Sequence, residues 1–129
     1  MKARLLWIEG KRADSPSFVP ALKRKDYQVE VVNTGNAALA RINDWEPDML
    51  VINAASLGSN GTRICQTVRN QQNRLPIILI LAANQVVSPD VPANVVLNLP
   101  FTVRKLVNRM APFIPGEGND ILRAGVIHL

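Results

Sequence analysis

The stretch from Pro47 to Gly61, "PDMLVINAASLGSNG", decides the fold of this chain of 129 residues. Met49 to Ile52 form a short apolar run, which is typical of a buried strand. The run ends at one polar residue, Asn53, and the chain then enters a loop of small residues. In an α/β sheet, functional side chains gather at the carboxyl ends of the strands. Asn53 is therefore the first candidate site residue, although chemistry at such a place usually needs a carboxylate.

Four other segments have the composition of strands, and with 48–53 they are 3–8, 27–32, 76–83 and 94–99. Segments with helical spacing of apolar residues alternate with them. These begin at Ser15, with Pro16 in the first turn, and continue with 37–42, 62–72 and Thr102 to Phe113. Apolar strands that alternate with helices pair in parallel and are covered on both faces. We therefore predict an α/β, doubly wound, five-stranded parallel sheet with helices on both faces.

The segment "ANQVVSPDVPAN", between the last two strands, breaks this rhythm. It is short and contains two prolines, so we predict that it forms no full helix. Without a helix here, Val86, Val87 and Val91 are expected to form an exposed apolar patch.

Composition limits the class of protein. With 47% hydrophobic and 19% charged residues, the chain is an ordinary single globular domain. Its one cysteine, Cys65, rules out a disulfide framework and is expected to pack in the core. The apolar run near the N-terminus is too short for a signal peptide or a membrane span. We therefore expect a cytoplasmic protein without a membrane partner.

The net charge of +5 and a pI of about 10.0 raise the question of a nucleic-acid partner. The cations are scattered apart from "LKRK" at 22–25, and no aromatic residues are interleaved with them. Direct nucleic-acid binding by this segment is not expected. Two interpretations of the cations remain: one basic face, or an ordinary solvated surface. The first would comprise Lys11, Arg12, Lys23, Arg24 and Lys25.

Four motifs together resemble the receiver domain of response regulators, the flavodoxin-like module of two-component signalling. They are "LLWIEG", "PDMLVINAASLGSNG", "LPIILILAA" and "NLPF", and the resemblance covers about residues 3–114. It implies a phosphoryl-accepting aspartate where this chain has Asn53. It also implies an acidic pair that holds Mg²⁺ where this chain has Glu9 and Gly10. It implies a hydroxyl where this chain has Leu81, and a lysine where it has Leu99.

These replacements predict a pocket that has lost its chemistry. An asparagine amide is a poor nucleophile and does not form an acyl phosphate. Glu9 alone offers too few oxygen ligands for Mg²⁺, and phosphoryl transfer needs the charge of a metal and a cation. With Leu81 and Leu99 expected to face the pocket, we predict no catalytic residue, no metal, no cofactor and no enzymatic activity. Asn53 is expected to hydrogen-bond Glu9 or nearby loop backbone.

The end of the chain suggests a second domain. We assign 1–114 to the receiver-like domain, 115–121 to a linker and 122–129 to the possible start of a C-terminal domain. The last segment resembles the first strands of the winged-helix, DNA-binding domain of OmpR/PhoB-type transcription regulators. The alternative is a tail without such a role.

The leading hypothesis is a pseudo-receiver: a phosphorylation-independent signalling or dimerisation module of a two-component-type transcription regulator. Its partners would be another protein or a second copy, with DNA bound through a C-terminal domain. The alternative is a small-molecule-sensing or partner-docking domain on the same fold. In that case the space between Glu9, Asn53, Leu81 and Leu99 would hold an uncharged or cationic ligand.

Overall fold

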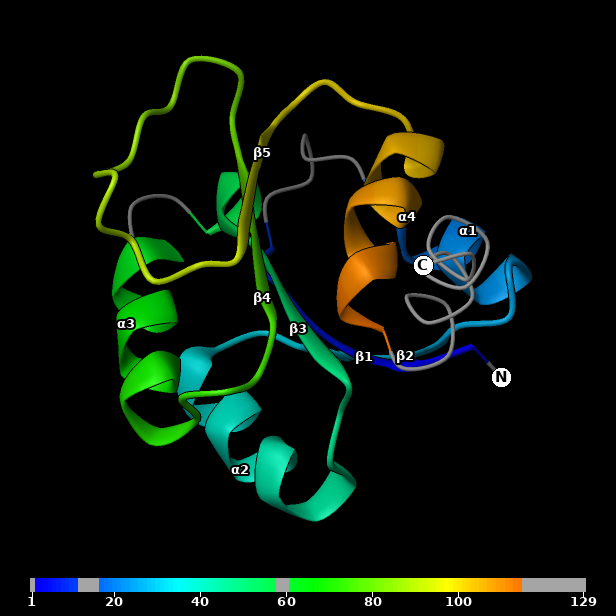
Figure 1. The fold of residues 1–129 in the computed structure, drawn as a ribbon, viewed down its shortest axis with the longest axis horizontal. Coiled ribbons are helices and arrows are strands. Elements are labelled where there is room, and N and C mark those ends of the chain that lie inside the picture. Colours follow the sequence, from blue (N-terminus) through cyan, green and yellow to red (C-terminus); the bar gives the residue numbers. More distant parts are fainter. Residues whose placement is uncertain (1, 12–16, 58–60, 115–129) are drawn as a thin grey trace, which may run out of the picture.

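Five parallel strands form a single sheet in the order β2-β1-β3-β4-β5 (Figure 1). The computed structural model describes residues 2–11, 17–57 and 61–114. The strands are β1 (Arg4–Glu9), β2 (Gln28–Val32), β3 (Met49–Asn53), β4 (Ile77–Leu81) and β5 (Val95–Asn98). Each lies within one residue of the predicted strand at its start, and the predicted fold class is confirmed.

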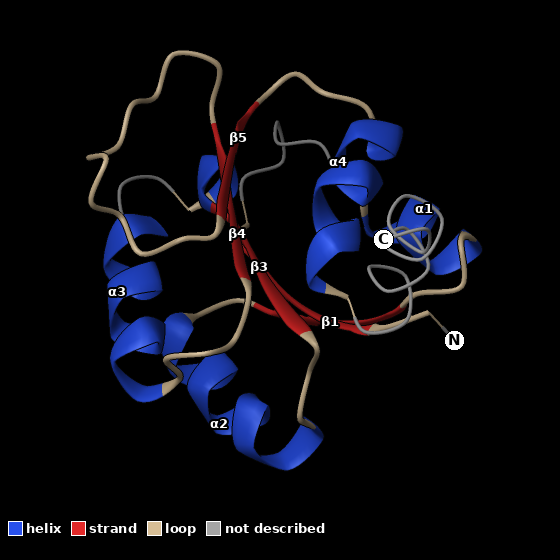
Figure 2. Ribbon diagram, viewed as in Figure 1, coloured by secondary structure: helices blue, strands red, loops and turns tan. Residues whose placement is uncertain are grey.

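Helices cover both faces of this sheet, as Figure 2 shows. They are α1 (Val19–Arg24), α2 (Gly35–Trp45), α3 (Gly61–Gln71) and α4 (Val103–Met110). Two single 3₁₀ turns, η1 (Ala54–Ser56) and η2 (Ala111–Phe113), follow β3 and α4. Helices α1 and α4 lie side by side on one face, and α2 and α3 lie on the other.

Alternate residues of each strand feed two separate cores, because successive side chains of a strand point to opposite faces. Leu5 and Trp7 of β1 pack in the core beneath α1 and α4. Leu6 and Ile8 pack in the core beneath α2 and α3. All four side chains are fully buried, so β1 contributes equally to both cores.

Two threonines fix where helices begin. Thr34 Oγ1 accepts a hydrogen bond from the Ala37 N–H at 3.0 Å, so α2 is longer than the predicted 37–42. Thr102 caps α4 in the same way, and η2 completes the predicted helix as far as Phe113. The expected cap at Ser15 and Pro16 lies outside the described residues, and α1 itself begins only at Val19.

Residues 82–94 contain no helix, as predicted, but they are held at both ends. At the C-terminal end of the segment, Arg69 of α3 donates to the Pro92 carbonyl and to Asn94 Oδ1. At its N-terminal end, Asn98 Nδ2 of β5 donates to the carbonyls of Ala82 and Gln85.

The apolar patch expected on this segment forms only in part. Val86 is 89% exposed, whereas Val87 and Val91 are half-buried against the core beneath α2 and α3. A continuous patch of three valines is therefore wrong, because the anchored loop folds two of them back onto the sheet.

Candidate functional site

Glu9 and Asn53 meet at the carboxyl edge of the sheet, as the sequence predicted. They are register partners at the ends of the parallel strands β1 and β3. Asn53 Nδ2 donates to Glu9 Oε1 at 3.1 Å, and the Asn53 side chain is fully buried. The amide at position 53 therefore supplies a donor to the neighbouring carboxylate, where a second carboxylate would repel it.

A second donor reaches the same oxygen. Trp7 Nε1 donates to Glu9 Oε1 at 3.2 Å, because residues two apart on a strand share a face. Trp7 lies within the strand predicted over 3–8 and is fully buried, but the sequence did not predict this bond. An ionised acceptor strengthens both hydrogen bonds. Glu9 is thus held by two neutral N–H groups.

Gly10 closes the place where a second acidic residue would stand. Its N–H donates to Ser56 Oγ at 2.8 Å, and that hydroxyl donates to the Asn53 carbonyl at 2.7 Å. A Cβ at position 10 would lie 2.0 Å from the Ser56 carbonyl oxygen. Since the obstacle is backbone, any side chain at position 10 requires η1 to move. Sequence reasoning did not identify Ser56, whose role depends on the path of η1.

Leu81 and Leu99 are separated by the sheet. Leu81 is buried in the core beneath α2 and α3, whereas Leu99 packs against the core beneath α1 and α4. Leu81 borders a cavity of about 350 Å³ with the 85–93 loop, and Leu99 borders another near Phe101. The expectation that both leucines face one pocket with Glu9 and Asn53 is wrong, because residue parity sends them to opposite faces.

The described donors do not fit Mg²⁺, which prefers several oxygen ligands in octahedral geometry. Glu9 is the carboxylate at this edge, Asn53 turns an N–H toward it, and Gly10 has no side chain. Across residues 2–11, 17–57 and 61–114, no group of three or more His, Cys, Asp or Glu could hold a metal ion.

A row of aromatic rings leads away from Glu9. The Trp7 and Phe18 ring centroids are 6.4 Å apart, and Phe18 stacks on Phe101 at 4.9 Å with 5° between the planes. Beyond these rings is an apolar hollow of about 410 Å³. Its lining residues are Phe18, Ala83, Leu99, Pro100 and Phe101.

Sequence comparison finds relatives of this chain among response regulators. No protein-family model matches the chain. The response regulator MprA of Mycobacterium sp. (strain KMS) is 29% identical over 128 residues, which are 93% of this chain and 56% of that protein. The chain therefore spans about half the length of the curated relatives that it matches.

Solved structures agree with this relationship. A putative response regulator from Chloroflexus aurantiacus superposes with a TM-score of 0.74 and 24% identity, over 88% of this chain and 98% of that one. The receiver domain of sensor histidine kinase PA1611 from Pseudomonas aeruginosa superposes with a TM-score of 0.73 and 19% identity, over 88% of this chain and 98% of that one. That structure has magnesium in its active-site cleft. The chain is thus similar in sequence to response regulators, and the solved structures show that it has the fold of a receiver domain. No helix among the described residues is both long enough and apolar enough to cross a bilayer.

Proposed function

We propose, from the premise of a receiver fold related to response regulators, that this chain is a pseudo-receiver. It acts as a phosphorylation-independent signalling or dimerisation module in a two-component-type regulator. It transmits its signal by contact with a partner protein or a second copy, and it has no enzymatic activity of its own.

The hydrogen bonds around Glu9 carry this proposal. Asn53 and Trp7 both donate to Glu9 Oε1, at 3.1 and 3.2 Å, so one oxygen of this carboxylate already accepts from two neutral donors. Gly10 lies against the Ser56 carbonyl, which leaves no room for the second acid of a metal site. An unreactive amide, at an edge where the described residues include no cluster of metal ligands, supports signalling without an acyl phosphate.

The position of Leu81 supports the same proposal. The resemblance to receiver domains implies a hydroxyl at this position, where it would bond a phosphoryl oxygen. Leu81 offers no hydroxyl, and it is 1% exposed within the core beneath α2 and α3. Burial of this aliphatic side chain favours one fixed packing of the end of β4 over a two-position switch.

The wider biological role is also part of the proposal. A C-terminal winged-helix domain of the OmpR/PhoB type would contact DNA, and the protein would work in the cytoplasm. Residues 115–129, on which the linker and the second domain were predicted, lie outside the described residues.

Intact-mass spectrometry after incubation with acetyl phosphate and Mg²⁺ tests the central claim. We expect no gain of a phosphoryl group on the wild type. We also expect Asn53→Asp alone to gain little, because Gly10 and Leu99 supply neither metal ligand nor cation. A stoichiometric phosphoryl adduct on the wild-type chain would refute the proposal.

Light scattering separates the two modes of contact. A dimer whose mass is the same with and without acetyl phosphate and Mg²⁺ supports constitutive dimerisation, and a monomer in both conditions supports docking of a different protein. A monomer that dimerises only with the phosphodonor would contradict phosphorylation independence.

The small-molecule alternative loses its expected site. Glu9 and Asn53 are bonded to each other, and Leu81 and Leu99 border two different cavities. The four residues therefore do not enclose a common space for a ligand.

A further inference from the structure

The exposed faces of α1 and α4 form one basic surface. Val19 of α1 and Leu106 of α4 are buried in the same core, and the two helices lie side by side in Figure 1. Within their bounds the helices contain five exposed cations and no Asp or Glu. We call these five residues the α1/α4 surface. They are Lys23, Arg24, Arg104, Lys105 and Arg109.

These cations have no acidic partner in the part of the chain that the structure describes. None of the five forms a salt bridge with an Asp or Glu of residues 2–11, 17–57 and 61–114. Arg41 of α2 shows the contrast, because its guanidinium is paired with the carboxylate of Glu30. The charge of the α1/α4 surface is therefore available to an anion from outside the chain.

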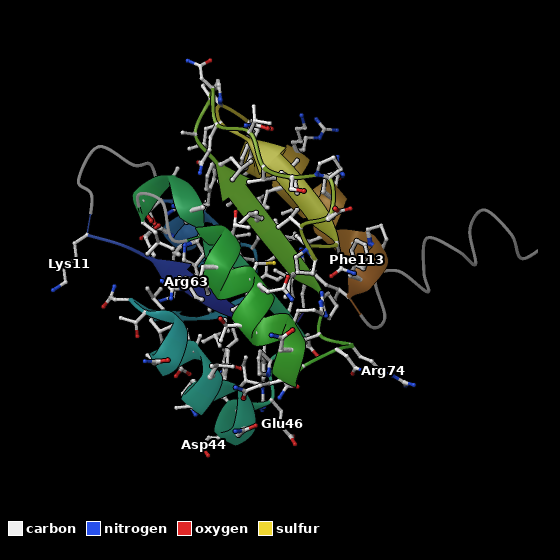
Figure 3. The ribbon with its side chains drawn as sticks, turned by 90° about the vertical axis from the view of Figure 1, so that its left-hand side faces the viewer. Lys11, Asp44, Glu46, Arg63, Arg74 and Phe113 are labelled. Carbon is white, nitrogen blue, oxygen red and sulfur yellow. The ribbon has the colours of Figure 1, made fainter. Side chains whose placement is uncertain are left out.

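The side of the molecule that carries α2 and α3 is mixed in charge. Figure 3 labels Asp44, Glu46, Arg63 and Arg74 on that side, and all four are exposed. A large anion would meet repulsion as well as attraction there. The α1/α4 surface is the better binding surface for such an anion, because its two helices contain no acidic residue.

The cations in the first turn of α4 do not stabilise this helix. Arg104 and Lys105 lie there, and the turn has no acidic residue. Cations at a helix N-terminus oppose the helix dipole, which favours negative charge at that end. Cations in a last turn have the opposite effect, so helix stability accounts for the basic last turns of α1 and α4. It does not account for Arg104 and Lys105, whereas attraction to an anionic partner does.

The composition of the surface indicates which anion it suits. All Phe, Tyr and Trp residues of the chain are buried or half-buried, so none is available to stack on unpaired bases. Among the described residues the exposed large hydrophobic side chains are Val31 and Val86, and neither belongs to α1 or α4. These helices therefore offer no apolar anchor for a bilayer. What remains is attraction to closely spaced charges, and duplex DNA carries one per about 1.7 Å of its axis, twice the density of a single strand.

We propose that the α1/α4 surface binds the phosphate backbone of duplex DNA without reading its sequence. The eight residues of α4 span about 12 Å, and a duplex presents about seven phosphate charges over that length, enough for all five cations. Binding releases the counterions of the phosphates that the cations neutralise. The sequence did not lead us to expect such binding, because the cations are scattered along the chain and only the fold gathers them.

This inference goes beyond the proposed function. In that proposal a C-terminal domain alone contacts DNA, whereas here the receiver fold itself also holds the duplex. Contacts to phosphates position a protein on DNA and carry no sequence information directly. The α1/α4 surface would therefore add affinity, and recognition of a particular site would be left to another part of the protein.

Fluorescence anisotropy of a labelled DNA duplex tests the proposal. The full 129-residue chain is titrated into the duplex in buffer with EDTA and without phosphodonor. Potassium chloride is varied from about 50 to 200 mM, where counterion release is readily measured. We expect equal affinity for two unrelated sequences, and a slope of log K against log salt no steeper than about −4.5, the value for five phosphate contacts. No binding at the lowest salt, a slope close to zero, or affinities that differ more than about tenfold between the sequences would overturn the proposal.

Double variants then locate the binding on the two helices. Lys105→Gln, Arg109→Gln removes two charges from α4, and Lys23→Gln, Arg24→Gln removes two charges from α1. Each pair is expected to reduce the magnitude of the salt slope by about two, because each cation on a phosphate accounts for about one. Circular dichroism confirms that each variant is folded, and the pairs test the surface independently because they lie on separate helices.

The double variant Arg63→Gln, Arg74→Gln is the matched control. It removes the same charge from the side that carries α2 and α3 (Figure 3), and its salt slope should equal that of the wild type. An equal reduction of the slope in this control would mean that net charge alone drives binding, and it would refute the assignment to the α1/α4 surface.

Two other polyanions are measured beside the duplex, at the same concentration of negative charge. Tighter binding to polyglutamate than to the duplex would replace the proposal by a surface for acidic polypeptides. Tighter binding to vesicles that contain phosphatidylserine would replace it by a membrane surface. These outcomes are separable from those of the phosphodonor test. Failure of duplex binding leaves phosphorylation independence intact, and a phosphoryl adduct leaves a measured duplex site intact.

Discussion

Gly10 makes the tightest backbone approach described near Glu9 and Asn53. We expect Gly10→Ala to lower the free energy of unfolding by about 1–3 kcal/mol, because the new Cβ would meet the Ser56 carbonyl at 2.0 Å. Urea unfolding followed by tryptophan fluorescence measures this loss. Gly35→Ala is the matched control, since its Cβ would meet the side chain of Ile64 at 3.2 Å and that side chain can shift. Equal losses in the two variants would contradict the closed state of position 10.

Cys65 provides a test by pH. Burial raises the pKa of its thiol to about 11, and the nearby charge of Arg69 lowers it in part. A thiol in the unfolded chain has a pKa of about 8.5. The unfolded state therefore loses its proton first as the pH rises, and the stability that comes from the neutral buried thiol, complete below about pH 8.5, is progressively lost toward pH 11.

The difference between wild type and Cys65→Ala in urea unfolding, from pH 7 to pH 10.5, isolates this contribution from other titrating groups. We expect the wild type to lose stability more steeply above about pH 8.5 than the variant does. Parallel curves would show that the thiol is not buried as described.

At the scale of single residues, the sequence predicted the contact between Glu9 and Asn53 but not the hydrogen bonds around it. Glu9 and Asn53 were expected to meet because both end parallel strands, and their hydrogen bond confirms it. The bonds from Trp7 and to Ser56 were not predictable, because they depend on a side-chain rotamer and on the path of η1. The alternation of side chains along β4 also explains why Leu81 packs in the core beneath α2 and α3.

At the scale of elements, the side chain of Arg69 acts as a clamp that holds residues 82–94, a segment in which no helix forms. Besides Pro92 and Asn94, its guanidinium donates to the carbonyls of Gln72 and Leu75, at 3.0 and 2.8 Å. It thereby joins the end of α3, the start of β4 and the 82–94 loop. The Ile77 N–H also donates to Asn94 Oδ1 at 2.8 Å, so the clamp extends into the sheet.

We expect Arg69→Lys to lower the free energy of unfolding by about 1–3 kcal/mol, since an ammonium cannot reproduce the fork of donors. Hydrogen exchange or limited proteolysis should show faster opening of 82–94 in the same variant. Arg63→Lys, at an exposed position of the same helix, is the control and should stay within about 0.5 kcal/mol of wild type. Unchanged protection of the loop would show that other contacts hold it.

Elements were more predictable than the contacts between them. Every strand was predicted from its apolar run, and the absence of a helix in 82–94 was predicted from its prolines. Local signals do not encode the clamp, because Arg69 and Asn94 are 25 residues apart in the chain. The same limit applies to Val87 and Val91, which the anchored loop returns to the sheet.

At the scale of the whole molecule, charge is partitioned between the two faces of the sheet. In the sequence the cations look scattered, because α1 and α4 are far apart in the chain and only the doubly wound topology brings them together. The predicted basic face contained Lys23 and Arg24 but not the cations of α4, and Arg12 lies outside the described residues. Charge segregation was thus a property of the fold that no local pattern contained.

This partition predicts how salt affects stability. Like charges over α1 and α4 repel one another in the folded state, and added salt screens exposed charges beyond a Debye length of about 8 Å at physiological ionic strength. We therefore expect the thermal midpoint to rise as sodium chloride is raised from low to physiological concentration. The double variant Lys105→Gln, Arg109→Gln should start with a higher midpoint and respond less to salt.

Arg63→Gln, Arg74→Gln removes the same number of charges from the mixed side and is the control for that experiment. Its midpoint should depend on salt as the wild type does, because acidic neighbours such as Asp44 and Glu46 lie on that side (Figure 3). An equal reduction of the salt response in both double variants would mean that net charge alone matters. A selective reduction in the α4 variant would show that the cations over α1 and α4 repel one another in the folded state, so that the arrangement of the charges matters as well as their sum.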